Sequence, residues 1–558
     1  MFISKVKICL VNIESTQYPL RTTPLGIISL GGYLKHIYKN KVVINYIDTQ
    51  IEHNKEKIID LIKQQKPDLI GISLKPGSEP LSYDILDIIF RTNLDSVVIL
   101  GGITPTYGHS SLLNNYNNTF CCIGRGEHTL QSLTDMVFRN NIMIDKIPNI
   151  AYVKNGYIHL TKNHFFNLNE CPKADWDGFF SYYSPNNYEE IWIERSSGCR
   201  RKGKQIGCSF CSILPNGGCY RWSKKKLSVV FSEINSLLSF GIRHIRFTDE
   251  EFFHDNSDDL ILFAHSMLSL SQQLKKCNDR FSFDLALRTD DVVLRSDYYK
   301  FNYNHTKLKA LKILKLAGLD QVYIGIESGN NCQLKRYNKG ITVKQNMNAI
   351  LAIRQIGIQV AAGWIMFDPL MKKVKEIEEN LNFLKLAQLI PTNVYDDFVP
   401  NPISCLKVIK GSQYQLQLEK YNVKTVNKDD SIEIKYEYIN KDIGFIVEKL
   451  TSAQKSIWPV YYLLKNIVAL GRFYSNNFQQ LPVANEIYFR LKHNDILMLD
   501  AILYATSDSN NIIESIQSDD SIKHIDKLRQ IIINEAQRII RQYVLINGGI
   551  SIVNCLSH

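Results

Sequence analysis

Four hydrophobic runs between residues 242 and 366 constrain the fold most, because each of them ends in polar residues and segments of helical periodicity separate them. The runs cover residues 242–247, 281–287, 321–326 and 359–366. The polar residues that follow them include Asp249, Arg288, Glu327 and Asp368. This alternation predicts a parallel α/β barrel, in which the carboxyl ends of the strands meet on one face and build the active site.

Three cysteines precede these runs, directly after the strand-like segment 191–193: Cys199, Cys208 and Cys211. Three thiolates can fill three corners of an iron–sulfur cube and leave the fourth iron open for a ligand. The gap between the first two cysteines carries Arg200, Arg201, Lys202 and Lys204, and positive charge favours the metal-binding thiolate. The alternative is a zinc knuckle with Cys219 as fourth ligand, since Cys-x2-Cys pairs commonly bind zinc.

The Cys-x2-Cys half of this loop, with Phe210 before the last cysteine, resembles the radical S-adenosylmethionine (SAM) enzymes. Their usual pattern is Cys-x3-Cys-x2-Cys, whereas the first gap here has eight residues. Widening a flexible gap from three to eight residues costs only about 0.9 kcal/mol of loop-closure free energy. The three cysteines can therefore still converge on one cluster.

The segment 316–329 and the tripeptide 338–340 resemble the radical SAM barrel of cobalamin-binding members of that family. The resemblance implies a 4Fe-4S cluster on the three cysteines and SAM at the strand ends, contacted by Phe210, Asp249, Glu250, Arg288 and Glu327. It places Asp249 and Glu250 at the SAM amino group, Glu327 at the ribose and Arg288 at the carboxylate. Read without the resemblance, the same residues are ordinary strand caps or solvated ends.

The first part of the chain alternates strand-like runs at 6–11, 42–47, 69–72 and 97–100 with helical segments. This rhythm predicts a doubly wound, Rossmann-like parallel sheet that holds a ligand at its carboxyl edge. The segments 24–26, 101–102, 124–127 and 172–176 resemble the cobalamin-binding domain that precedes many radical SAM barrels. The resemblance implies cobalamin as cofactor, with the site residues Ser73, Gly101, Gly102, Thr104, Gly126 and Glu127. The sheet alone would also suit flavin or nucleotide.

None of the 13 histidines lies in an Asp-x-His-x-x-Gly pattern, and the loop 12–23 contains no histidine. We therefore expect a bound cobalt without a protein imidazole ligand. A cobalt that lacks a strong lower ligand more readily holds the reduced state that accepts a methyl cation.

The expected fold class is α/β in three parts. The boundaries are 1–145 for the cobalamin-binding domain, 146–187 for a connector with a hairpin at Asn155-Gly156, 188–400 for the partial (β/α) barrel and 401–558 for a mostly helical domain. In the last part, Trp458, Tyr461 and Tyr462 are candidates for a substrate pocket, although aromatic residues at helical spacing more often pack in a core.

The formal net charge of +11 comes from short, scattered basic runs, which indicates solvated faces and no nucleic-acid partner. No apolar stretch approaches about 18 residues, so we expect no membrane span. The 12 cysteines do not have the spacing of a disulfide framework in a secreted protein. The first residues lead into a strand without the apolar run of a signal peptide, so we expect a cytoplasmic protein.

The family resemblance implies a cobalamin-dependent radical SAM enzyme, and we favour a methyltransferase acting on an unactivated carbon of a specialised metabolite or peptide. Its one-electron reductant would be external, such as flavodoxin or ferredoxin. A rearrangement, cyclisation or oxidation with the same cofactors is the first alternative. A more distant alternative is an RNA-modifying methylthiotransferase, which would need a second cluster on cysteines of the first domain: Cys9, Cys121, Cys122 and Cys171.

Overall fold

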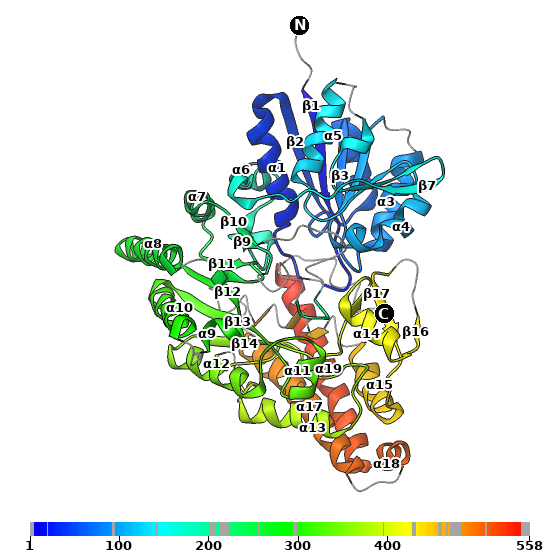
Figure 1. Ribbon diagram of the computed structural model, residues 1–558, viewed down its shortest axis with the longest axis vertical. Helices are drawn as coiled ribbons and strands as arrows, with labels where there is room; N and C mark the ends of the chain where they lie inside the picture. Colours follow the sequence, from blue (N-terminus) through cyan, green and yellow to red (C-terminus); the bar gives the residue numbers. More distant parts are fainter. Residues whose placement is uncertain are drawn as a thin grey trace.

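The computed structural model of the chain describes residues 5–18, 20–91, 95–139, 143–199, 207–211, 222–254, 257–293, 298–393, 395–426, 431–455, 460–461, 463–464, 467–468, 481–507 and 511–547. Figure 1 shows three parts in chain order: a first α/β domain, a central layer of strands and helices, and a helical part near the C-terminus. The described part of the chain contains no helix that is long and apolar enough to cross a membrane.

The first domain is built on a seven-stranded sheet with the order β2-β1-β3-β4-β5-β6-β7. Its parallel strands are β1 (Val6–Asn12), β2 (Val42–Asp48), β3 (Leu69–Ser73), β4 (Val97–Gly101) and β5 (Phe120–Cys122). Two sets of buried apolar residues show that helices cover both faces of the sheet. The helices are α1 (Leu25–Tyr38), α2 (Lys55–Gln65), α3 (Glu79–Arg91), α4 (Ile103–Asn115) and α5 (Glu127–Arg139). This is a doubly wound fold, as predicted.

The hairpin expected in the connector belongs to this sheet. Strand β6 (Ile150–Lys154) pairs antiparallel with β5, and β7 (Tyr157–Leu160) pairs antiparallel with β6. Asn155 and Gly156 both have positive φ, 53° and 80°, as a tight primed turn between two strands requires. A short helix, α6 (Trp176–Phe180), follows and buries Trp176 completely. The connector is thus packed on the first domain along most of its length.

The central part is a five-stranded parallel sheet with the order β14-β13-β12-β11-β8, a partial barrel. Its strands are β8 (Trp192–Ile193), β11 (His244–Phe247), β12 (Ser282–Arg288), β13 (Leu319–Glu327) and β14 (Gln359–Trp364). The helices between and after them are α7 (Leu227–Ser239), α8 (Ser257–Lys276), α9 (Thr289–Val292), α10 (Tyr298–Ala317), α11 (Asn331–Arg336), α12 (Val343–Gln355) and α13 (Lys375–Leu386).

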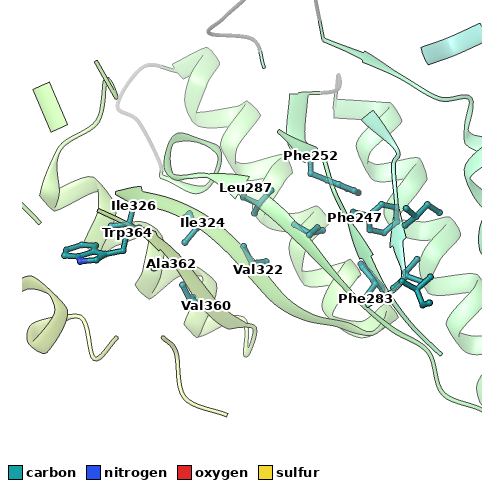
Figure 2. Packing of buried hydrophobic residues seen from close by; sticks show 14 of the residues in the cluster. Phe247, Phe252, Phe283, Leu287, Val322, Ile324, Ile326, Val360, Ala362 and Trp364 are labelled. Carbon is teal, nitrogen blue, oxygen red and sulfur yellow. The ribbon is translucent and has the colours of Figure 1, made fainter. Parts of the chain in front are cut away.

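The two faces of this sheet differ in chemistry because successive side chains of a strand point to opposite faces. Figure 2 shows the apolar set that packs toward the helices, including Phe283, Val322, Ile324 and Val360. The concave face carries the alternate residues, among them Asp284, Gln321 and Tyr323. The polar interior of the barrel is therefore a direct result of the two-residue period.

The last part begins with a small three-stranded sheet of β15 (Val408–Ile409), β16 (Thr425–Val426) and β17 (Glu433–Tyr436). Earlier in the chain, β9 (Ser196–Ser197) and β10 (Ser223–Lys224) form a separate antiparallel pair. The helices of this part are α14 (Gln413–Lys420), α15 (Lys441–Lys455), α17 (Leu481–Thr506), α18 (Ile512–Ser518) and α19 (Asp520–Asn547). In Figure 1, α17 and α19 run side by side next to the barrel, and their contacts agree. The predicted fold class is confirmed in all three parts.

Candidate functional site

The two closely spaced cysteines lie in a turn, residues 207–211, that is fixed by hydrogen bonds from three directions. The amide of Ser209 donates to the carbonyl of Tyr337 at 2.8 Å, its hydroxyl donates to the carbonyl of Arg336 at 2.9 Å, and its carbonyl accepts from the amide of Tyr414 at 2.9 Å. Phe210 packs edge-to-face on Tyr337 with ring centroids 5.1 Å apart. Phe210 therefore acts as a packing anchor of the turn in this structure.

Cationic side chains surround the thiols. Cys199 and Cys208 are both buried, and the guanidinium of Arg288 donates to the Cys199 sulfur at 3.8 Å. Arg288 and Lys339 both interact electrostatically with Cys208. Positive charge stabilises thiolates, which are the metal-binding form of cysteine. This charge suits thiolate ligands at Cys199 and Cys208, which together with Cys211 stay the predicted ligands of an iron–sulfur cluster.

Within the described ranges, no three His, Cys, Asp or Glu side chains lie close enough together to bind a single metal ion. A cube takes one thiolate on each iron, so its cysteines need not meet at one point as zinc ligands do. Cys219, which the zinc interpretation requires, lies outside the described residues, as do the basic residues 200–204.

Arg288 leaves one donor group unused. It is buried; its Nε pairs with Asp290 at 3.0 Å and lies 4.0 Å from Glu251, and its Nη2 has no hydrogen-bond partner among the described residues. Burial alone would lower the pKa of this guanidinium, but the neighbouring carboxylate and thiols raise it above its ordinary value. A permanently charged, unpaired donor beside the cluster cysteines suits a carboxylate ligand.

Glu327 ends β13 in a strained conformation. Its φ is +66°, in the left-handed region that residues other than glycine rarely adopt, and the register with β14 shifts at this point. Its Oε1 accepts from Lys339 at 2.9 Å, and both side chains are largely buried. Strain of this kind persists where the surrounding structure enforces it, most often at functional sites. Glu327, the residue predicted to bind the ribose, is thus held rigidly at the end of the strand.

Asp249 and Glu250 contact the chain just before Cys199. Asp249 accepts from the amides of Arg195 and Ser196 at 2.9 and 2.8 Å and from the Ser196 hydroxyl at 2.5 Å. Burial raises the pKa of Asp249 to about 6 despite these donors. Glu250 accepts from the amide of Gly198 at 2.9 Å. Both carboxylates therefore fasten the start of the cluster loop to the end of β11.

A groove in the first domain lies between the sheet and the helices α1 and α5 and comprises about 940 Å³ including its mouth. Its lining contains five of the six predicted cobalamin residues: Ser73, Gly101, Gly102, Gly126 and Glu127. A Cβ atom at Gly26 or Gly101 would meet no atom closer than 4.0 Å, so these glycines widen the groove. The described lining residues include no histidine. Thr104 is buried without a partner for its hydroxyl but does not line the groove.

Arg125 joins this groove to the barrel. It donates to Glu127 at 2.6 Å and to Glu194 at 2.8 Å, and Glu194 follows β8 directly. Glu194 also lines the groove, although it lies only five residues before Cys199. The charge of Arg125 outweighs burial and lowers the pKa of Glu194. The second oxygen of Glu127 is buried without a partner, so a ligand amide could donate to it.

A second cavity lies inside the barrel and comprises about 1210 Å³ including its mouth. Residues of the concave strand faces form its wall, and Tyr488, Phe489 and Lys492 of α17 close it together with Val468. Tyr461 does not line this cavity; it donates to the carbonyl of Pro400, which does. Trp458 and Tyr462 lie outside the described residues. Arg125 and Lys339 lie in segments that carry the family resemblance, but the sequence predicted no site role for them or for Glu194 and Lys492, because single charged residues are too common to mark a site.

The four cysteines of the first domain lie in unfavourable surroundings for a second cluster. Burial raises the pKa of Cys9, Cys122 and Cys171 to about 12 and that of Cys121 further. Protonated, desolvated thiols bind metal poorly. These four cysteines therefore lend no support to the methylthiotransferase alternative.

Comparison with known protein families identifies a B12 binding domain at residues 15–134 and a radical SAM superfamily domain at residues 193–384. The chain thus belongs to a class of α/β proteins that combine these two cofactor domains. Within that class it belongs to the cobalamin-binding radical SAM enzymes. The domains imply cobalamin, SAM and a 4Fe-4S cluster as cofactors.

Among curated proteins, the chain is 29% identical over 397 residues to 4'-phospho-dehydrooxetanocin synthase of Priestia megaterium, a match that covers 69% of this chain and 50% of that protein. The chain therefore spans about half the length of this relative. Among solved structures, the cobalamin-dependent SAM radical enzyme OxsB with aqua-cobalamin and SAM superimposes with a TM-score of 0.77 at 22% identity, covering 100% of this chain and 83% of that one. The radical SAM methyltransferase TsrM of Kitasatospora setae gives 0.60 at 13% identity, covering 96% and 99%.

Proposed function

We propose that the protein is a cobalamin-dependent radical SAM methyltransferase that acts on an unactivated carbon of a small molecule or peptide. The observation that carries the proposal is that one short segment contributes to both predicted cofactor sites. Glu194 lines the groove of the first domain, and Cys199 stands five residues further along the same segment. This short link supports a reaction that uses both cofactors.

When bound, the cluster and SAM supply a radical that removes a hydrogen atom, and cobalamin supplies a methyl group. The chain's own residues bind and orient these partners. Arg288 offers an unpaired donor for the SAM carboxylate, and Glu327 offers an acceptor for the ribose hydroxyls. Arg125 and Glu127 set the position of the groove wall. Holding reacting groups in place supplies much of the rate of such a reaction.

The absence of histidine from the described lining of the groove supports methyl transfer, because a cobalt without imidazole more readily reaches the reduced state that accepts a methyl cation. The match to 4'-phospho-dehydrooxetanocin synthase supports a second candidate, a rearrangement or oxidation with the same cofactors. The external reductant is proposed to be a flavodoxin or ferredoxin in either case.

Product stoichiometry tests the two candidates. The anaerobically purified protein should carry about four irons per chain, with zinc absent, and should bind hydroxocobalamin. With its substrate, a methyltransferase should form S-adenosylhomocysteine and 5′-deoxyadenosine in equal amounts, together with a product heavier by one methyl group. Formation of 5′-deoxyadenosine without matching S-adenosylhomocysteine would refute methyl transfer and support the second candidate. A zinc-loaded protein without iron would refute both.

A further inference from the structure

The cavity inside the barrel has a buried acceptor that no described residue satisfies. The side chain of Asp284 is 4% exposed and lines the cavity. Its Oδ2 accepts from Arg246 at 3.1 Å and lies 3.4 Å from the Nε2 of His244. Its Oδ1 has no hydrogen-bond partner in the part of the chain that the structure describes. A buried carboxylate oxygen without a donor is unfavourable, so a ligand that supplies the donor is stabilised there.

The lining of the cavity contains more acidic than basic side chains. Three carboxylates line it, those of Glu190, Asp249 and Asp284, against the cationic side chains of Arg246 and Lys492. Arg246 is already shared between two of these carboxylates, with Glu190 at 2.8 Å. Burial raises the pKa of Asp284, but His244 and Arg246 outweigh it and lower the pKa, so this carboxylate stays ionised. The open oxygen therefore carries negative charge at neutral pH.

The rest of the wall is apolar and aromatic. Lys492 is buried at the edge of the cavity, donates to the carbonyl of Val399 at 3.3 Å, and holds its ammonium 4.6 Å from the ring centroids of Phe398 and Tyr488. These two rings, with Phe489, belong to the lining. A mainly apolar cavity with a few polar groups is the usual form of a small-molecule site.

The cavity also lies next to the cluster site. Ala286 lines the cavity, and Arg288, on the same face of β12 two residues further, contacts the Cys199 sulfur. Two residues of strand span about 7 Å, so a molecule in the cavity lies within reach of groups bound at the strand ends. The helix α17 contributes Tyr488, Phe489 and Lys492 to the wall of the same cavity.

We propose that this cavity binds the substrate, and that it selects a molecule with a protonated amine that donates to Asp284 Oδ1 and an apolar or aromatic part that packs on Phe398 and Tyr488. This assignment rests on the proposed function and narrows the substrate class. The same negative charge disfavours phosphorylated or carboxylate substrates. The substrate class would thus differ from the phosphorylated compound in the name of the Priestia megaterium relative.

Three probes that share a phenylethyl group and differ in their polar group test the proposal: 2-phenylethylamine, 2-phenylethanol and 3-phenylpropionate. Calorimetry on the anaerobic, cofactor-loaded protein should show that the amine binds at least about tenfold more tightly than the alcohol, and that the anion binds most weakly. Asp284→Asn should remove the difference between amine and alcohol. The matched control is Asp279→Asn, because Asp279 precedes the same strand, pairs with Arg243 at 2.8 Å and lies outside the cavity.

Several outcomes would overturn the proposal: equal affinity of the three probes, tightest binding of the anion, absence of binding by the amine, or an amine preference that survives Asp284→Asn. Lys492→Met gives a second check, since it should weaken only the anion. The proposed function is monitored separately by 5′-deoxyadenosine formation from SAM in the wild type and in Asp279→Asn. If the wild type shows no preference for the amine but still cleaves SAM, the cavity assignment alone is refuted, whereas absence of SAM cleavage refutes the enzyme assignment.

Discussion

Residues at the strand ends have two different roles in this protein: some position the cluster loop, and others present groups to a ligand. Asp249 and Glu250 use their carboxylates on backbone amides of the segment 195–198 and so position the cluster loop. Arg288 and Glu327 keep an unpaired or strained group at the face where SAM is expected. A residue whose hydrogen bonds are already satisfied within the protein gains little from a ligand, whereas an unsatisfied one gains much.

Glu327→Ala tests the ribose assignment. The change removes an acceptor for hydroxyl groups and the partner of Lys339, and we expect SAM affinity to fall by about 1.5 to 3 kcal/mol, or about 10- to 150-fold. Calorimetry with SAM on the cluster-loaded protein measures this. Glu437→Ala is the control, because Glu437 forms a similar pair with Lys424 on the surface. Unchanged SAM affinity in Glu327→Ala would mean that Glu327 only shapes the strand end.

At the scale of elements, the cluster turn depends on segments far from it in sequence. Residues 207–211 are held between the end of α11 and the start of α14. Asp368 connects these two helices, since it accepts from Arg336 at 2.7 Å and from the Tyr414 hydroxyl at 2.7 Å. This carboxylate is completely buried, and it holds together α11 and α14, the two helices on either side of the turn.

Tyr414→Phe should therefore weaken the cluster site without touching a cysteine. Loss of a hydrogen bond to a buried carboxylate costs about 1.5 to 3 kcal/mol, and the looser α14 no longer fixes the carbonyl of Ser209. We expect a lower thermal midpoint and faster loss of iron to a chelator. The control is Tyr46→Phe, which removes a buried hydroxyl that donates to the Asp175 carboxylate at 2.7 Å, far from the turn in sequence and on strand β2 of the first domain. Equal rates of iron loss in the two variants would contradict the role of Asp368 in positioning the turn.

At the scale of the whole molecule, Arg125 connects the groove of the first domain to the barrel through Glu127 and Glu194. The three side chains lie where the first domain meets the segment that leads to Cys199. The pKa of Glu194 is lowered, so this ion pair contributes stability at and above the ordinary carboxyl range and loses it only as pH falls below that range. The connection is thus constant across neutral pH.

Arg125→Met should loosen the groove from the barrel, because it leaves two buried carboxylates without their cation, a change that costs about 3 to 5 kcal/mol. We expect hydroxocobalamin affinity to fall by at least about tenfold in a visible-absorption titration. Arg243→Met removes a comparable but more exposed pair with Asp279 and should bind cobalamin as the wild type does. If both variants bind cobalamin with wild-type affinity, Arg125 has no part in shaping the groove.

The sequence predicted the fold well because local patterns determine it. The alternation of buried strands and amphipathic helices appears directly in the runs that became β11 to β14, and the Asn155-Gly156 turn appears at its expected place. The placement of the hairpin differed: it joins the first sheet through β5, because an exposed strand edge offers unpaired amides that a nearby hairpin can satisfy.

The sequence by itself thus determined the order of the domains, the three cysteines and the polar strand ends, since these depend on neighbours within a few residues. Only the tertiary structure decided which residues share a site. The unsatisfied oxygen of Asp284, the pairing of Glu327 with Lys339 and the position of Glu194 in the groove arise from contacts between distant segments. The physical reason is that burial and hydrogen-bond satisfaction are properties of three-dimensional packing, which local sequence spacing does not encode.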